Sequence, residues 1–312
     1  MTDSVLREDM ALCAKTLNDN GLLPALSGKT VFITGATGLI GSQMVRTLLE
    51  ANRLYDADIT VAAFIRNEQK AQAMFEDVLP NGKLDFVIGD LSRPVEYDKP
   101  VDYVVHGASA TGSKFFVESP VETIETAIYG TDRLLQFARD KQVSGMVYLS
   151  SLEVYGVPDG KNPTISESDY GLIDPLSVRS SYSEGKRMVE CLCASYASEY
   201  GVPVKVARLS QTFGAGVEYH DGRVFAEFAR CLMEKKDIVL HTDGSTVRSY
   251  CYTADAVCAL YTILLKGESG EAYNVTNMDT ACSIREMAEL VAGLEPEAGV
   301  NVRIEIPEDV AS

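Results

Sequence analysis

The chain has no tryptophan, only three histidines, and too few basic residues to balance its acidic ones. Its 312 residues include 28 Lys and Arg against 45 Asp and Glu, which gives a formal net charge of −17. A nucleic-acid-binding protein needs a basic face, so this charge argues against such a partner. A polyanionic substrate would have to be bound by a few local arginines against an unfavourable overall field.

Long apolar runs and paired-cysteine patterns are also missing. No stretch approaches membrane-spanning length and the N-terminus has no signal-peptide pattern, so we expect a cytoplasmic protein without a membrane partner. The seven cysteines are an odd number without the spacing of a disulfide framework, which fits a reducing compartment. The histidines are scattered, and we expect no metal site.

What the chain does contain is a glycine cluster directly after a β-branched and aromatic run. Residues 30–33 predict a short buried strand, and residues 42–49 have helical composition. Glycines in a strand–turn–helix allow a tight turn, close approach of a pyrophosphate and helix–strand packing, while free N–H groups at the helix start bind phosphate. We therefore predict a dinucleotide site that includes Gly35, Thr37, Gly38, Leu39, Ile40 and Gly41.

The following strands supply further candidate cofactor contacts. Strands are predicted at residues 59–65, 84–88 and 101–106, and their carboxyl ends would border a cofactor in a doubly wound sheet. An acidic residue after the second strand normally binds the ribose hydroxyls, but this chain has Arg66, which suits a 2′-phosphate or stacks on adenine. The prediction is therefore NAD, with NADP still open. The other predicted contacts are Asp90, Leu91 and Ala108.

A second motif places a phenol and an ammonium four residues apart. Tyr182 and Lys186 lie in a predicted helix over residues 180–200, where this spacing puts both side chains on one face. A tyrosine with the ordinary pKa of about 10 is a poor base, and a nearby ammonium and a positive nicotinamide ring lower that pKa. Lys186 is also expected to contact the cofactor.

Two further residues follow the predicted strand at residues 146–150. The hydroxyl of Ser151 would relay a proton between substrate oxygen and phenol, and Glu153 is a further candidate acid or base. A solvated loop carboxylate is an equally good interpretation of Glu153. The alternative interpretation of the helix motif is a surface Tyr–Lys pair without a role in catalysis, and the upstream glycine cluster argues against it.

These motifs resemble the extended short-chain dehydrogenases/reductases of the nucleotide-sugar epimerase/dehydratase kind, over residues 29 to about 307. By this resemblance Ser151, Tyr182 and Lys186 match the catalytic trio, the three cluster glycines match the cofactor glycines, and Asp90 matches the residue near the adenine ring. The resemblance implies a nucleotide-sugar substrate. The substrate-binding residues that it implies are Thr111, Gln211 (where the family has Asn), Arg223 and Arg248.

The resemblance also bears on the reaction. The 4,6-dehydratases carry an aspartic acid where this chain has Leu152, which has no proton to give, so dehydration is disfavoured. The motifs look closest to UDP-glucuronate decarboxylases, in which oxidation at C4 gives a 4-keto sugar that loses CO2 before the hydride returns. A 4-epimerase needs the same trio and stays open. The sequence also leaves open an NADPH-dependent reductase of a keto-sugar or other carbonyl, supported by Arg66, and a non-catalytic dinucleotide-binding protein.

The predicted fold class is α/β, a doubly wound parallel (Rossmann) sheet with a smaller, interleaved C-terminal substrate lobe. We predict a helical N-terminal arm at residues 1–26, a dinucleotide-binding core at 27–212, and a region at 213–312 that is mainly the substrate lobe. Apolar helices at residues 121–141 and 180–200 resemble those that pair in the family's dimers, so we expect a homodimer.

Overall fold

The computed structural model of the chain describes residues 4–109, 112–158, 160 and 164–306. The chain divides into two compact units. The first comprises Met1–Leu209 and Thr253–Val275, and the second Ser210–Tyr252 and Thr276–Ser312. The N-terminal arm, predicted as a segment of its own, belongs to the first unit, and the chain returns to that unit for residues 253–275, so that the two units are interleaved in sequence.

The first unit is built on a seven-stranded sheet with the order β10-β6-β5-β4-β1-β2-β3. Every neighbouring pair in this sheet is parallel, which confirms the predicted fold class. The chain order reverses between β1 and β4, and ligands of doubly wound sheets bind at such a reversal, beyond the carboxyl ends of the strands. The strands are β1 (Thr30–Thr34), β2 (Thr60–Ile65), β3 (Leu84–Ile88), β4 (Tyr103–His106), β5 (Gly145–Ser151), β6 (Val204–Leu209) and β10 (Ala272–Val275).

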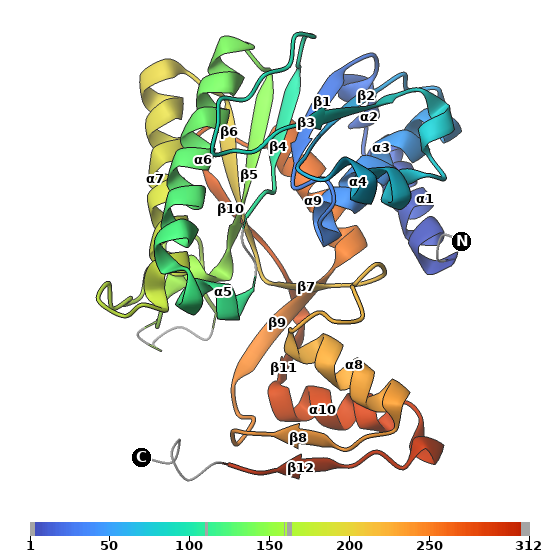
Figure 1. The fold of residues 1–312 in the computed structure, drawn as a ribbon, viewed down its shortest axis with the longest axis vertical. Coiled ribbons are helices and arrows are strands. Elements are labelled where there is room, and N and C mark those ends of the chain that lie inside the picture. The colour runs from blue at the N-terminus through green and yellow to red at the C-terminus, as the bar shows by residue number, and fades with distance from the viewer. Residues whose placement is uncertain (1–3, 110–111, 159, 161–163, 307–312) are drawn as a thin grey trace. The chain divides into compact units, whose positions relative to one another are not determined.

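Helices cover both faces of this sheet (Figure 1). On one face α6 (Pro120–Asp140) and α7 (Ser180–Tyr200) pack side by side over a continuous apolar cluster. On the other face α3 (Leu39–Tyr55) and α9 (Thr253–Lys266) pack together and against α1 (Ser4–Asp19). Because both faces are covered, strands such as β1 are buried along nearly their whole length. Shorter elements are α2 (Leu23–Leu26), α4 (Glu68–Phe75), η1 (Leu79–Asn81), α5 (Ser113–Glu118) and η2 (Leu152–Tyr155).

The N-terminal arm contributes to the core of the first unit. Three of its regularly spaced apolar residues, Met10, Cys13 and Leu17, are buried on one face of α1. The thiol of Cys13 donates a hydrogen bond of 3.4 Å to the carbonyl oxygen of Ala254 at the start of α9. The amphipathic spacing of the arm therefore serves packing.

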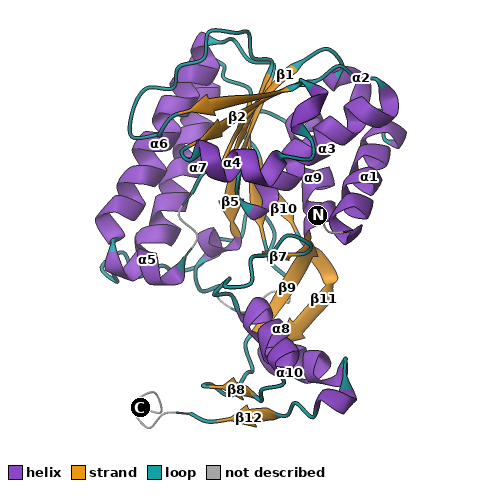
Figure 2. Cartoon of the chain, turned by 45° about the vertical axis from the view of Figure 1, so that its right-hand side comes forward, coloured by secondary structure: helices purple, strands orange, loops and turns teal. Residues whose placement is uncertain are grey.

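The second unit holds a three-stranded sheet with the order β11-β9-β7 and a parallel pair of β8 and β12 (Figure 2). A small apolar cluster around Phe228, Ile238, Leu240 and Ala288 joins this pair to two helices. Ser283 and Glu286 form a capping box at the start of the second helix. The elements are β7 (Gln211–Phe213), α8 (Val224–Glu234), β8 (Ile238–Leu240), β9 (Val247–Tyr252), β11 (Asn277–Ser283), α10 (Ile284–Gly293), η3 (Pro296–Ala298) and β12 (Val302–Ile304).

Candidate functional site

The turn between β1 and α3 depends on glycine at two positions. Gly35 has φ +69°, and a Cβ there would lie 2.6 Å from the carbonyl carbon of Gly107 in the loop after β4. A Cβ on Gly41 would collide with the carbonyl oxygen of Gly35. The loops after β1 and β4 therefore touch at the reversal of the sheet, and only glycines allow that approach.

The start of α3 fits the diphosphate of a dinucleotide. Gly38 occupies the N-cap position, is exposed, and has no side chain to cap the helix. The first N–H groups of a helix have no acceptor within it, and here they belong to Leu39, Ile40 and Gly41. The first turn carries no acidic side chain that would repel an anion, and Thr37 lies half-buried beside it.

The predicted contacts at the other strand ends differ in character. Arg66 is exposed at the end of β2. Hydrogen bonds from Ser92 lower the pKa of Asp90, and the charge of Arg66 adds to this effect. Leu91 is buried in the apolar cluster under α6, so its side chain serves packing. Ala108 is half-buried, and its N–H donates a 3.2 Å hydrogen bond to the hydroxyl of Thr34.

Lys186 lies buried under the carboxyl end of β5. Its Nζ donates a 2.8 Å hydrogen bond to the main-chain carbonyl oxygen of Leu149 and lies 4.6 Å from the ring centre of Tyr148 and 5.7 Å from that of Tyr182. Burial lowers the pKa of Lys186 to about 8, because the charged form loses its hydration, while the charge of Glu190 opposes this effect. The approach of the Lys186 ammonium to the Tyr182 ring agrees with two side chains on the same face of α7.

The phenol ring of Tyr182 is stacked on a second aromatic ring. Its ring lies 4.2 Å from that of Phe116 with an interplanar angle of 15°. Burial raises the pKa of Tyr182 to about 12, while the side chain of Ser151 acts to lower it and the charge of Glu153 to raise it. In the chain alone, desolvation of the phenolate outweighs the favourable contacts.

Glu153 is held in an ion pair and does not stand free in solvent. Its Oε1 accepts a 2.9 Å hydrogen bond from Nη2 of Arg179, and its Oε2 accepts one of 2.9 Å from the hydroxyl of Ser183. The guanidinium carbon of Arg179 lies 5.2 Å from the ring centre of Phe116. Sequence reasoning missed both Arg179 and Phe116. The position of Arg179, three residues before Tyr182, is the one signal that the sequence offers.

A buried histidine under the same loops was also missed. The Nδ1 of His106 lies 2.8 Å from the hydroxyl oxygen of Thr34, and its Nε2 lies 2.9 Å from that of Thr131. Burial lowers the pKa of His106 to about 3, and the charge of Lys186 acts in the same direction. His106 is therefore neutral at physiological pH and links β4 to β1 and to α6.

The predicted substrate-binding residues of the second unit differ in how far their side chains are engaged by other groups of the protein. Arg223 forms a bidentate pair with Asp221, at 2.6 Å for the shortest contact, and its Nη1 donates to the carbonyl oxygen of Thr212 at 2.9 Å. Arg248 is exposed on β9, and its Nη1 donates a 2.8 Å hydrogen bond to the adjacent carbonyl oxygen of Val247. Gln211 is half-buried at the start of β7. Thr111 lies outside the described residues.

The described residues hold no group of three or more His, Cys, Asp or Glu side chains arranged to bind a metal ion. None of the helices in the described ranges is both long and apolar enough to cross a bilayer. The fold, the glycine turn and the pair of half-buried Tyr182 and buried Lys186 define the chain as a Rossmann-type dinucleotide-binding protein.

Comparison with known proteins gives the family. Residues 31–276 match the model of the NAD dependent epimerase/dehydratase family. UDP-glucuronic acid decarboxylase 6 of Arabidopsis thaliana is 30% identical over 287 residues, which cover 91% of this chain and 79% of that protein. The chain therefore belongs to the NAD dependent epimerase/dehydratase family of enzymes, whose cofactor is a nicotinamide dinucleotide.

Solved structures agree with this assignment. A dTDP-glucose 4,6-dehydratase from Streptomyces venezuelae with NAD bound is 26% identical, with a TM-score of 0.72 over 91% of this chain and 86% of that one. A UDP-N-acetylglucosamine 4-epimerase from Methanobrevibacter ruminantium shares the fold, with a TM-score of 0.75 at 20% identity over 90% of this chain and 87% of that one.

Proposed function

We propose that this chain modifies a nucleotide-linked sugar through a transient 4-keto sugar, with UDP-glucuronate decarboxylation as the leading reaction. The observation that carries the proposal is the approach of the buried Lys186 to Tyr182, with Nζ 5.7 Å from the ring centre, beside Ser151, which lowers the pKa of the phenol. The similarity to a UDP-glucuronic acid decarboxylase over most of both chains supports the choice of reaction. A 4-epimerase uses the same three side chains and is the second reaction that the test below distinguishes.

The roles of the residues follow from their positions. A bound nicotinamide dinucleotide supplies the hydride acceptance and return. Tyr182 takes the proton of the C4 hydroxyl, and Ser151, whose side chain acts on the pKa of the phenol, relays it. Since the pKa of Tyr182 is raised to about 12, mainly by burial, the tyrosine needs added positive charge to act as a base. The charge of Arg179 already acts in that direction, and the ammonium of Lys186 lies 5.7 Å from the ring centre.

We assign Glu153 an orienting role in the site. Its carboxylate receives both Arg179 and Ser183, and Ser183 adjoins Tyr182 on α7. The pair fixes the start of the helix that carries the phenol. Leu152, in place of an acid, offers no proton to a leaving hydroxyl group, so we do not propose 4,6-dehydration.

For the cofactor we propose NAD, bound at its diphosphate by the start of α3. The name of the matching family supports NAD, whereas the exposed Arg66 suits the 2′-phosphate of NADP. Asp90 lies close enough to Arg66 for their charges to interact, which reduces the positive potential offered to a 2′-phosphate. Chromatography of the nucleotide released on denaturing the purified protein distinguishes the two.

We also propose a homodimer in a reducing, cytoplasmic setting. The outward side of α6 and α7 exposes Val121, Ile124, Tyr129 and Met188, an apolar surface that a second copy would cover. All seven cysteines are free thiols, which suits a reducing compartment.

The experiment that tests the function is mass spectrometry of the protein incubated with NAD+ and UDP-glucuronate, with UDP-, dTDP-, CDP- and GDP-hexoses in parallel. Loss of CO2 from the uronate alone is the expected result. A change of sugar configuration without change of mass, detected by chromatography or NMR, would replace decarboxylation by epimerisation. Stoichiometric consumption of NADPH with a carbonyl substrate would instead make the chain a reductase.

A further inference from the structure

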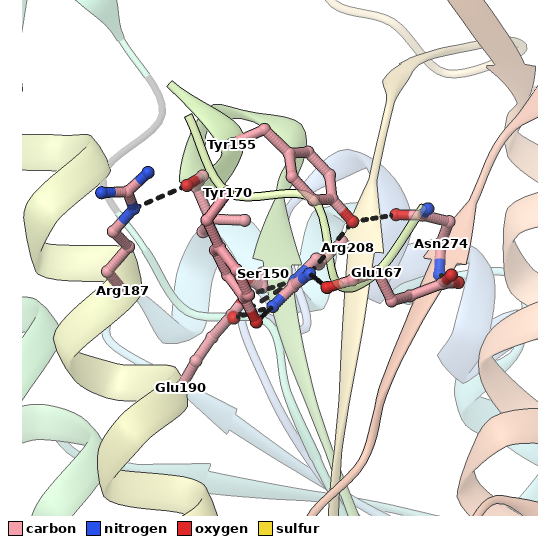
Figure 3. A network of polar contacts seen from close by, with 9 residues as sticks. Ser150, Tyr155, Glu167, Tyr170, Arg187, Glu190, Arg208 and Asn274 are labelled. Carbon is pink, nitrogen blue, oxygen red and sulfur yellow. Dashed lines mark hydrogen bonds and ion pairs between the residues drawn. The ribbon is translucent and has the colours of Figure 1, made fainter. Parts of the chain in front are cut away.

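A buried ion pair lies between β6 and α7 (Figure 3). The side chains of Arg208 and Glu190 are only 2% and 11% exposed, and Nη2 of the arginine donates to Oε2 of the glutamate at 2.6 Å. The remaining donors of Arg208 reach the hydroxyls of Tyr155 and Tyr170 at 3.0 and 2.8 Å, and the carbonyl oxygen of Glu167 at 2.7 Å. With Nε also bonded to Glu190 at 3.1 Å, all five guanidinium N–H groups have an acceptor.

Glu190 connects this ion pair to the strand end that faces the candidate catalytic residues. Its Oε1 accepts a 2.5 Å hydrogen bond from the hydroxyl of Ser150. Ser150 stands between Leu149, whose carbonyl oxygen accepts a hydrogen bond from Lys186, and Ser151, whose side chain lowers the pKa of Tyr182. Glu190 therefore binds Ser150, and the two neighbours of Ser150 on β5 act on Lys186 and on Tyr182.

We propose that Glu190 and Arg208 form a charged clamp that positions Ser150, and with it the end of β5, against Lys186 and Tyr182. Both are positioning residues: Glu190 acts on Lys186 and Tyr182 through its hydrogen bond with Ser150 and through its charge, and Arg208 holds Glu190 in place. The inference rests on the proposed function only in taking Lys186 and Tyr182 as the catalytic pair.

The clamp also sets the electrostatic surroundings of Lys186. The imidazole of His106 on β4 is neutral, and burial keeps the phenol of Tyr148 and the thiol of Cys193 protonated. Tyr182 is protonated as well at neutral pH. Glu190 is therefore the anionic group among those that face Lys186 in the described residues, and it lies one helical turn away on α7. The groups that face Lys186 are His106, Tyr148, Tyr182, Glu190 and Cys193.

Two variants of Glu190 separate its charge from its shape. Glu190→Gln keeps the size and the hydrogen-bonding oxygen but removes the charge. Glu190→Asp keeps the charge on a shorter side chain. Selective 13C labelling of lysine side chains allows the protonation of Lys186 to be followed by NMR in the full-length protein, with the resonance assigned from Lys186→Met.

The expected result is a titration midpoint for Lys186 that moves to lower pH by about one unit in Glu190→Gln and stays near that of the unmodified protein in Glu190→Asp. Lys205, a second buried lysine with a lowered pKa and no contact with Glu190 among its causes, is the internal reference and should not move. Asp77→Asn is the matched control, because it breaks another arginine–carboxylate pair, with Arg46, in the same unit. An unchanged midpoint in Glu190→Gln would overturn the electrostatic part of the proposal.

The positioning part is tested with Ser150→Ala, which removes one hydroxyl and leaves the ion pair intact, so that folding is preserved. We expect turnover to fall about tenfold, with little change in KM and an unchanged Lys186 midpoint. Turnover equal to that of the unmodified enzyme would overturn this part. If the unmodified protein converts no sugar nucleotide, the proposed function fails, but the NMR titration still decides whether Glu190 controls Lys186.

Discussion

The ammonium of Lys186 donates a 2.8 Å hydrogen bond to the main-chain carbonyl oxygen of Leu149, two residues before Ser151 on the same strand. Ser151 on β5 and Tyr182 and Lys186 on α7 therefore lie on two elements that pack together in one unit. Each group is buried or half-buried, so a change of charge at this site is only weakly screened by water.

Replacement of Tyr182 by Phe removes the proton acceptor and keeps the ring that stacks on Phe116. We expect turnover to fall by at least about 100-fold, while the cofactor stays bound and the melting temperature changes little. Tyr200→Phe is the matched control, since it makes the same change on an exposed part of the same helix. Steady-state kinetics and nucleotide content are the measurements, and near-normal turnover of Tyr182→Phe would contradict the assignment.

Burial of His106 predicts a loss of stability in acid. The pKa of His106 is about 3 in the folded chain and about 6.5 when unfolded. Between these values the unfolded chain binds the proton and the folded chain does not, so the contribution is fully present above pH 6.5 and is lost as the pH falls. His106→Asn removes this titration.

Urea unfolding at pH 7 and pH 4.5 measures the effect. The unmodified protein should lose about 2–3 kcal/mol more than His106→Asn over this interval, because each unit of pKa difference corresponds to about 1.4 kcal/mol. Comparison with the variant cancels the carboxylates that also titrate in acid. Equal losses in both proteins would show that His106 does not remain neutral.

The two arginines of the second unit should respond differently to truncation. Arg248 has no side-chain partner among the contacts described for it, so Arg248→Ala should leave stability unchanged and raise KM for a nucleotide sugar about tenfold. Arg223 is already paired with Asp221, so Arg223→Ala should cost about 1 kcal/mol of unfolding free energy. Steady-state kinetics and thermal unfolding of both variants measure these effects. A KM that rises only in Arg223→Ala would show that Arg223, and not Arg248, binds the substrate.

The exposed apolar surface of α6 and α7 predicts a dimer that a single charge disrupts. Ile124→Glu or Met188→Glu places a carboxylate on that surface, and we expect sedimentation at micromolar concentration to show monomers. Leu290→Glu on α10, in the second unit, is the control, since it makes a like change on another exposed apolar side chain. A monomeric unmodified protein would remove the basis of this prediction.

Several features could be predicted from sequence because they are local. The strand before Gly35 and the helix after Gly38 follow from residue type and periodicity within about twenty residues. The helix that carries Tyr182 and Lys186 is predicted over the same residues, 180–200, that the structure assigns to it. The alternation of strands and helices is enough to predict the doubly wound sheet.

Other features were not predicted because their partners lie far away in the chain. Glu153 meets Arg179 across 26 positions, and Arg208 meets Glu167 across 41. The return of residues 253–275 to the first sheet depends on β10 pairing with β6, which no local pattern signals. Pairing at such distances in sequence depends on the whole chain having folded.

The sequence by itself determined which chemical groups are present and how the helices and strands that carry them are spaced, because backbone sterics and apolar periodicity act over short distances. Only the tertiary structure decided the charge states of those groups. Burial lowers the pKa of Lys186 and raises that of Tyr182, and the amount of water left around a side chain is set by everything that packs on it.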